Sequence, residues 1–299
     1  MNLSALFNAL PGACAQGLIW GLMAIGVYIT DKGLDIADLT VDGTMCTGGA
    51  VCVMLMLNGC NVWVALTCAF IAGMLAGLIT GIFHTVMGIP AILAGILTQL
   101  ALYSINLRIM GSANQAISVR KYDLLISLLH IPQAIGIVAI FTVVLIAILY
   151  WFFGTEFGCA MRATGCNNRM AKAQGINTDY VKVFGLMLSN GIVALCSALY
   201  SQYQGFADIN MGRGAIVIGL AAVIISEVIF GKLFKNFGLK LLAVSIGAVL
   251  YYLVIQVVLW LGLNTDDLKL LTALVVGAFL AVPAMREKIF TAFKRKVVR

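Results

Sequence analysis

The chain has 299 residues, of which 62% are hydrophobic and 10% are charged, and its formal net charge is +7. Soluble domains contain about 45–50% apolar and about 25% charged residues, so this composition excludes an ordinary soluble globule. The basic residues gather in a few interhelical loops and near the C-terminus, which is a topology signal of membrane proteins and excludes nucleic-acid binding as the reason for the charge.

Continuous apolar runs of about 17–25 residues are long enough to cross roughly 30 Å of hydrocarbon as helices, whereas barrel strands would alternate polar and apolar residues. The sequence therefore predicts an all-α integral membrane protein, a polytopic bundle of about nine transmembrane helices. The bundle forms one domain over residues 1–299, and one of its helices is a candidate for a discontinuous helix. The predicted spans are 13–30, 39–58, 61–85, 88–110, 134–153, 181–203, 214–230, 239–262 and 268–285.

The first polar stretch, DKGLDIADLTVDGTMCTGG at 31–49, holds four of the twelve acidic residues of the chain. Its Asp and Thr residues are good N-caps, so we predict a helix that begins inside the membrane or at its edge, as helices beside transporter sites often do. An ordinary loop and an aspartate cation site remain alternatives. The pathway candidates in this stretch are Asp42, Gly43, Thr44, Gly48 and Gly49.

Polar residues within apolar spans are costly and are therefore functional candidates. Gln99, Asn190 and Glu227 are the further pathway candidates. Gln99 and Asn190 could equally form hydrogen bonds between helices, and Glu227 could be a lysine-paired carboxylate at the membrane interface. The cysteines lie mostly in apolar runs without a C-x-x-C pair, so we expect packing roles and no metal site.

A second polar stretch, GTEFGCAMRATGCNNRMAKAQGINTD at 154–179, interrupts the later spans. Read as one helix, it spreads Arg162, Arg169 and Lys172 around one side and ends at Gly175, a typical residue after a helix C-terminus. A short basic helix at the surface of a membrane protein suggests a docking element for a cytoplasmic partner.

The basic tail, 286–299, predicts a cytoplasmic C-terminus by the positive-inside rule. Counting spans backwards places 154–180 and 232–240 inside and 112–132 and 207–213 outside, with the N-terminus outside. An N-terminus inside would require the 31–49 region to be re-entrant. The chain contains no P-loop, Rossmann, zincin or nucleophile-elbow motif, so we expect no catalytic residue, and energy for pumping must come from a partner or an ion gradient.

The segment GCAMRATGCNNRMAKAQGIN resembles the cytoplasmic loop G-x-x-x-R-A-x-G-x-N-x-x-x-A-x-x-x-G-I-[ND] of permease subunits of ABC importers in the branched-chain amino-acid and ribose permease superfamily. LDIADLTVDGT resembles the segment after the first core helix, in the branch that includes permeases proposed for aromatic amino acids. The loop positions that match are Gly158, Arg162, Ala163, Gly165, Asn167, Ala171, Gly175, Ile176 and Asn177.

This resemblance implies a permease domain whose 154–180 loop docks on separate ABC ATPase subunits, which would hold the ATP and Mg, with no cofactor in this chain. It further implies a bacterial cytoplasmic membrane location, an extracytoplasmic solute-binding protein that touches 112–132 and 207–213, and a second permease copy, identical or paralogous. The solute would be an amino acid, and an aromatic one in the narrower expectation. The implied coupling residues are Arg162, Ala163, Gly165, Asn167, Asn168, Arg169, Met170, Ala171 and Gly175.

Two alternatives remain. An ion-coupled secondary transporter would use the aspartates at 31–42 and Glu227 as coupling carboxylates, and its uptake would survive ATP depletion. A scaffold or channel subunit without pumping has no positive sequence feature behind it.

Overall fold

The computed structural model describes residues 3–119, 121–122, 124–231, 233–234, 236–261, 270, 273–274 and 276–278. Within these residues seven helices are long and apolar enough to cross a membrane, which confirms the all-α polytopic class. They are α1 (Leu3–Tyr28), continued by the π-helix η1 (Ile29–Gly33), α2 (Thr40–Leu57), α3 (Val62–Thr85), α4 (Ala91–Met110), α5 (Ile131–Phe153), α8 (Thr178–Gln204) and α10 (Phe237–Trp260).

The remaining elements are shorter. They are strand β1 (Asn114–Ala116), the 3₁₀ helix η2 (Leu128–His130), α6 (Glu156–Cys166), α7 (Asn168–Ala173), strand β2 (Phe206–Asp208) and α9 (Ala215–Phe230). Eight of the nine predicted spans coincide with a helix, and the ninth, 268–285, lies largely outside the described residues. At 16 residues α9 is only about 24 Å long, which is short of the hydrocarbon thickness of roughly 30 Å.

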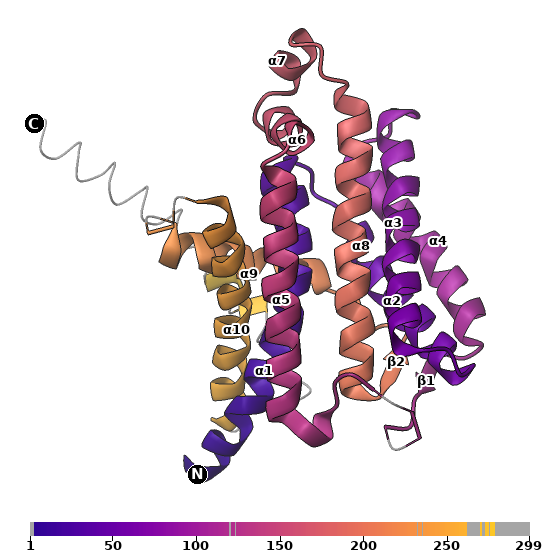
Figure 1. The fold of residues 1–299 in the computed structure, drawn as a ribbon, viewed down its shortest axis with the longest axis vertical. Helices are drawn as coiled ribbons and strands as arrows, with labels where there is room; N and C mark the ends of the chain where they lie inside the picture. The colour runs from indigo at the N-terminus through magenta and orange to yellow at the C-terminus, as the bar shows by residue number, and fades with distance from the viewer. Residues whose placement is uncertain are drawn as a thin grey trace, which may run out of the picture.

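Helix α8 stands at the centre of the bundle, between α1, α2 and α3 (Figure 1). Small residues allow this close packing: a Cβ added to Gly73 or Gly77 of α3 would collide with backbone carbonyls of α8, and one on Gly48 of α2 would collide with Ala194. Membrane helices associate through such contacts because lipid supplies no hydrophobic drive between them. On the other side of α1, α9 and α10 pack together, with Gly247 against the backbone of Ala222.

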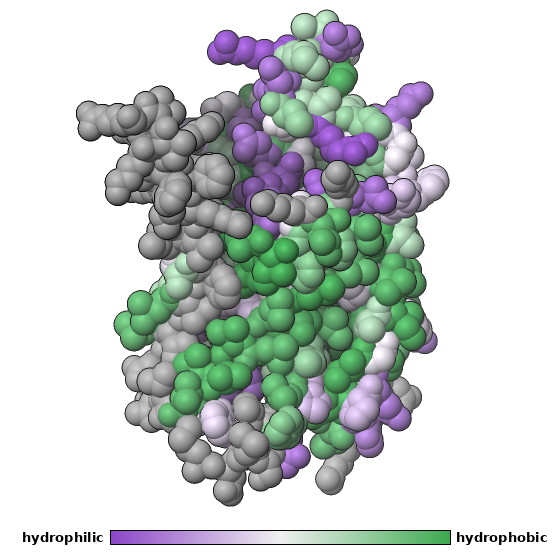
Figure 2. Space-filling model, turned by 90° about the vertical axis from the view of Figure 1, so that its left-hand side faces the viewer, coloured by the Kyte–Doolittle hydropathy of each residue, from purple (hydrophilic) through white to green (hydrophobic). Residues whose placement is uncertain are grey.

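Large apolar side chains on α3, α4 and α5 face outward, for example Ile71, Leu100 and Ile140. Figure 2 shows the resulting hydrophobic band across the middle of the molecule, with hydrophilic residues above it and below it. Such a band is what a bilayer requires of a spanning bundle.

Polar elements mark the two ends of the bundle. Helices α6 and α7 project from one end, and the N-terminus and the β1–β2 pair lie at the other (Figure 1). The strands are antiparallel, with Gln115 opposite Ala207. They therefore bring together the two connections, predicted as 112–132 and 207–213, that the sequence assigns to one face.

Candidate solute pathway and coupling segment

Helix α2 begins in the interior of the bundle. Its Thr44 hydroxyl donates to the Asn190 side-chain oxygen at 2.7 Å, and Asn190 lies twelve residues beyond Thr178, the first residue of α8, or about 18 Å along that helix. The first turn of α2 is almost entirely buried. The discontinuous entry predicted for the 31–49 region is therefore present.

The Asp38 carboxylate holds this helix start in place. It accepts the Thr40 backbone N–H at 2.9 Å and the Asn190 amide at 2.6 Å, and both Asp38 and Asn190 are buried. Asn190, predicted as a pathway residue, thus uses its oxygen for Thr44 and its nitrogen for Asp38 and the Leu186 carbonyl. A buried carboxylate needs such donors to remain inside a protein.

A chain of three threonine hydroxyls extends this network to two further helices. Thr40 and Thr80 lie 2.7 Å apart, and Thr80 donates to Thr98 at 2.9 Å. All three side chains are buried, so α2, α3 and α4 are joined at this level. The sequence alone does not indicate Thr80 or Thr98, because a threonine in an apolar helix can also donate its hydroxyl to its own helix backbone, as Thr98 does here to the Ala94 carbonyl.

Asp42 joins α2 to the beginning of α9. Its two carboxylate oxygens accept the backbone N–H groups of Gly214 and Ile216, each at 3.0 Å. The first N–H groups of a helix lack partners within the helix and carry a partial positive charge, so a carboxylate stabilises them. Gly212 packs against the Asp42 carbonyl, where no side chain fits. Helix α9 therefore also begins inside the bundle.

Next to Asp42 lies a cavity of about 250 Å³, which we call the Asp42 cavity. It includes three predicted pathway residues, Asp42, Gly43 and Gln99, and three that the sequence did not indicate, Tyr103, Asn106 and Arg213. The Asn106 amide donates to the Gly43 carbonyl at 3.4 Å, and its buried side-chain oxygen has no partner among the described residues. By contrast, Gly48 and Gly49 pack against α8 side chains and backbone.

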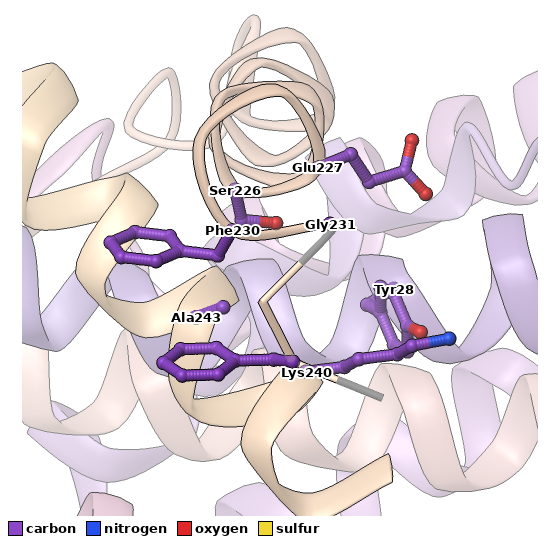
Figure 3. Close-up of a pocket in the computed structure, with 8 residues that line it drawn as sticks. Tyr28, Ser226, Glu227, Phe230, Gly231, Lys240 and Ala243 are labelled. Carbon is purple, nitrogen blue, oxygen red and sulfur yellow. The ribbon is translucent and has the colours of Figure 1, made fainter. Parts of the chain in front are cut away.

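Glu227 lies at the end of the bundle that carries α6 and α7. It forms an ion pair with Lys32 at 3.3 Å, and the two side chains are 48% and 41% exposed. A pocket of about 200 Å³ lies beside it, and in Figure 3 Lys240 extends toward Tyr28 while Glu227 points away. This geometry matches the interfacial, lysine-paired alternative for Glu227, with Lys32 as the partner.

The four aspartates at 31–42 do not converge. Asp31 lies 3.8 Å from Lys32, and Asp35 is exposed. Asp38 accepts hydrogen bonds from α2 and α8, and Asp42 accepts them from the start of α9. The described residues include no group of three or more His, Cys, Asp or Glu side chains able to hold a metal. The described part of the chain thus offers no cation cage of the kind that the aspartate alternative would need.

The 154–179 segment forms two helices, so the prediction of one helix ending at Gly175 was wrong. Asn167 adopts an extended conformation, with φ −158° and ψ 96°, and its side chain accepts the Met170 N–H at 3.1 Å. It thereby ends α6 and caps α7, as asparagine favours. Gly175 does follow α7 with a positive φ of 82°, and the Ile176 N–H bonds to the Ala171 carbonyl.

The two helices differ in what their residues touch. Arg162 on α6 turns back to the bundle, donating to the Phe153 carbonyl at 2.9 Å with its guanidinium over the Phe237 ring. Gly165 presses on the Gly33 carbonyl of η1 so closely that a Cβ would collide with it. On α7, Arg169 and Met170 are exposed. Of the remaining predicted coupling residues, Asn167 and Gly175 are exposed, Ala163 and Asn168 are partly buried, and Ala171 is buried.

Apolar helices that begin inside the bundle, a buried polar network and a cavity beside it are features of membrane transport proteins. The family model described as branched-chain amino acid transport system / permease component matches residues 12–284. This chain belongs to that permease family, as its loop motif predicted.

Individual proteins agree with the family. The chain is 40% identical over 266 residues to the tyrosine transport system permease protein of Clostridioides difficile (strain R20291), covering 89% of this chain and 88% of that one. It is 28% identical over 218 residues to the autoinducer 2 import system permease protein LsrC of Escherichia coli (strain K12 / DH10B), covering 72% and 61%. The solved structure of PsaBC from Streptococcus pneumoniae in complex with Fab has a similar fold, with a TM-score of 0.52, 14% identity, and 94% and 95% coverage.

Proposed function

We propose that this chain is the membrane permease of an ATP-driven importer of an amino acid, and of an aromatic one in particular. The observation that carries the proposal is the family match over residues 12–284 together with 40% identity to a tyrosine transport system permease protein. The solute would pass the Asp42 cavity, where Gly43 and Gln99 line the wall. The contact between α2 and α8 would shape this path from the other side, through Thr44, Gly48, Gly49 and Asn190.

The α6–α7 segment is the proposed coupling element for a separate ABC ATPase. The exposed side chains of Arg169 and Met170 would meet the ATPase, and Gly175 would set the turn after α7. Arg162 and Gly165 would transmit its movement, because they contact α5, α10 and η1 directly. Ala163, Asn167, Asn168 and Ala171 would maintain the shape of the segment.

The proposed assembly follows from this assignment. Two permease copies, identical or paralogous, would offer two coupling elements to two ATPase subunits, which bind the ATP and Mg. A solute-binding protein would dock on the surface built around the β1–β2 pair, at the end opposite α6 and α7 (Figure 1). The complex would lie in a bacterial cytoplasmic membrane with α6, α7 and the 286–299 tail inside; that tail lies outside the described residues.

Reconstitution tests the proposal. The tagged chain, co-expressed with candidate ATPase and binding-protein genes, is expected to co-purify with the ATPase and to take up labelled L-tyrosine into proteoliposomes only with ATP. Uptake that persists without ATP and collapses with an uncoupler would favour the ion-coupled alternative and overturn the proposal.

A matched pair of variants tests the coupling surface. Met170 on α7 and Met87 in the loop between α3 and α4 are both exposed, at 57% and 61%. Met170→Asp is expected to reduce ATPase co-purification and ATP-driven uptake by about tenfold or more, since a charge at the centre of an apolar contact costs several times RT. Met87→Asp is expected to retain both. Equal effects of the two variants would rule out α7 as the docking element.

A further inference from the structure

A larger cavity, of about 760 Å³, lies between α1, α8, α9 and α10. This volume is within the range of about 300–1,000 Å³ that ligand pockets occupy. Its polar and aromatic lining residues are Gln16, Trp20, Tyr200, Arg213, Tyr252 and Gln256. We call it the aromatic cavity.

Three aromatic rings form one wall. Trp20 packs edge-on to Tyr200, with ring centroids 5.6 Å apart, and against Tyr252 at 5.9 Å. Trp20 is 5% exposed and therefore fixed by its surroundings. Rings held in this way present edges and faces to a further ring, which favours aromatic over aliphatic contacts.

The polar groups of the aromatic cavity are richer in donors than in acceptors. The Trp20 Nε1–H has no acceptor among the described residues. The Tyr200 hydroxyl oxygen accepts from Gln204 at 2.9 Å and from Gln16 at 3.4 Å, which leaves its own proton to donate. No Asp or Glu occurs among the described residues of the lining. Such a site complements a ligand that brings its own negative charge.

Arg213 supplies the only formal charge among the described lining residues. Its exposed guanidinium makes no ion pair and no side-chain hydrogen bond with a described residue, because the neighbouring Asp42 carboxylate is taken up by the Gly214 and Ile216 N–H groups. Arg213 also lines the Asp42 cavity. An arginine whose guanidinium N–H groups have no partner is suited to bidentate binding of a carboxylate.

We propose that the aromatic cavity binds an aromatic amino acid within the permease, with Trp20, Tyr200 and Tyr252 around the ring and Arg213 on the carboxylate. The inference rests on the proposed function and adds the site and its chemistry. Because Arg213 borders both cavities, the bound carboxylate can stay on one side chain while the solute moves toward Asp42.

Binding to the permease alone tests this assignment apart from ATP-driven uptake. The full-length chain in lipid nanodiscs is titrated with L-tyrosine, with tyramine, which lacks the carboxylate, and with L-leucine, and saturation transfer from protein to ligand is measured by NMR. L-tyrosine is expected to bind at least about tenfold more tightly than tyramine, as expected for charge-assisted hydrogen bonds, and more tightly than L-leucine.

Variants identify the anchoring group. Arg213→Gln is expected to weaken L-tyrosine binding by about tenfold or more and not to weaken tyramine binding, because the ammonium of tyramine is repelled by the arginine, while Arg213→Lys retains part of the preference. Arg108→Gln, which changes an exposed arginine at the end of α4 that lines neither cavity, is expected to bind as the unmodified chain does. If Arg213→Gln does not fold, Arg213→Lys and the comparison of tyrosine with tyramine decide.

Three results would overturn the inference: no saturation transfer to L-tyrosine, as when a lipid chain or a second copy fills the cavity; equal binding of tyrosine and tyramine; or equal weakening of both by Arg213→Gln. None of these results bears on co-purification with the ATPase or on ATP-driven uptake, so a failure of the site stays distinct from a failure of the proposed function.

Discussion

The Asp42 carboxylate on α2 accepts the backbone N–H of Ile216 on α9 at 3.0 Å, and its second oxygen accepts that of Gly214. Residues 174 positions apart in the sequence are thus joined through a helix N-terminus. The contact fixes the starts of α2 and α9 to each other inside the bundle.

Replacing Asp42 is therefore expected to loosen α9. Asp42→Ala removes two charge-assisted hydrogen bonds and leaves the donors of α9 without partners, at a cost of about 2–3 kcal/mol. Asp42→Asn keeps one acceptor oxygen and should cost less. Thermal unfolding of the purified chain in nanodiscs measures the difference; equal melting temperatures for Asp42→Ala and the unmodified chain would contradict the assigned role.

The Asp38–Asn190 pair permits an exchange experiment. Asn190→Leu leaves the Asp38 carboxylate buried without its amide donor, and we expect a loss of about 2–4 kcal/mol. The double variant Asp38→Asn with Asn190→Asp restores a donor opposite a carboxylate and should recover much of the stability lost by Asp38→Asn alone. A double-mutant cycle on urea unfolding measures this coupling, and strictly additive effects would show that the pair is not coupled.

Gly165 connects α6 to η1, and its substitution should separate folding from coupling. Gly165→Ala forces α6 away from the Gly33 carbonyl, so ATP-driven uptake by the assembled complex should fall severalfold while the chain still inserts and purifies. Gly136→Ala is the matched control, because nothing lies within 4 Å of the added Cβ at that position of α5. Full uptake by Gly165→Ala would remove this contact from the coupling path.

Glu227 is expected to tolerate neutralisation. Half-exposed ion pairs contribute about 0–1 kcal/mol, so Glu227→Gln should retain stability and ATP-driven uptake. The ion-coupled alternative predicts the opposite for uptake, since there the carboxylate would carry the driving ion. Uptake of L-tyrosine by proteoliposomes at several pH values distinguishes the two.

The features that the sequence predicts well are the positions of individual helices, which depend on each helix alone. Apolar runs predicted eight of the helices in the described residues with ends within a few positions, because span length is set by the bilayer; the exception is the start of α1, which lies at Leu3 and not at 13. The break at Asn167 was missed although two adjacent asparagines favour a cap over a helix interior. The interior start of α2 was predicted because acidic and threonine residues precede an apolar run there.

The partners of the polar residues were less predictable, since they depend on which helices become neighbours. Asn190 was found by its cost in an apolar span, but its contact with Asp38 spans 152 residues. Arg213 looked like an ordinary loop arginine until the return of 205–214 into the bundle placed it between two cavities. Only tertiary packing distinguishes such a residue from a topology signal.

The interior start of α9 also affects the electrical profile across this protein. The backbone that leads to Gly214 carries polar groups from the end with the β1–β2 pair to Asp42, so the poorly polarisable layer is thinner here than the surrounding bilayer. A membrane voltage would then fall mainly across the remaining half, where Asp38, Asn190 and the three threonines lie. Movement of a charged group through that half would sense most of the membrane potential.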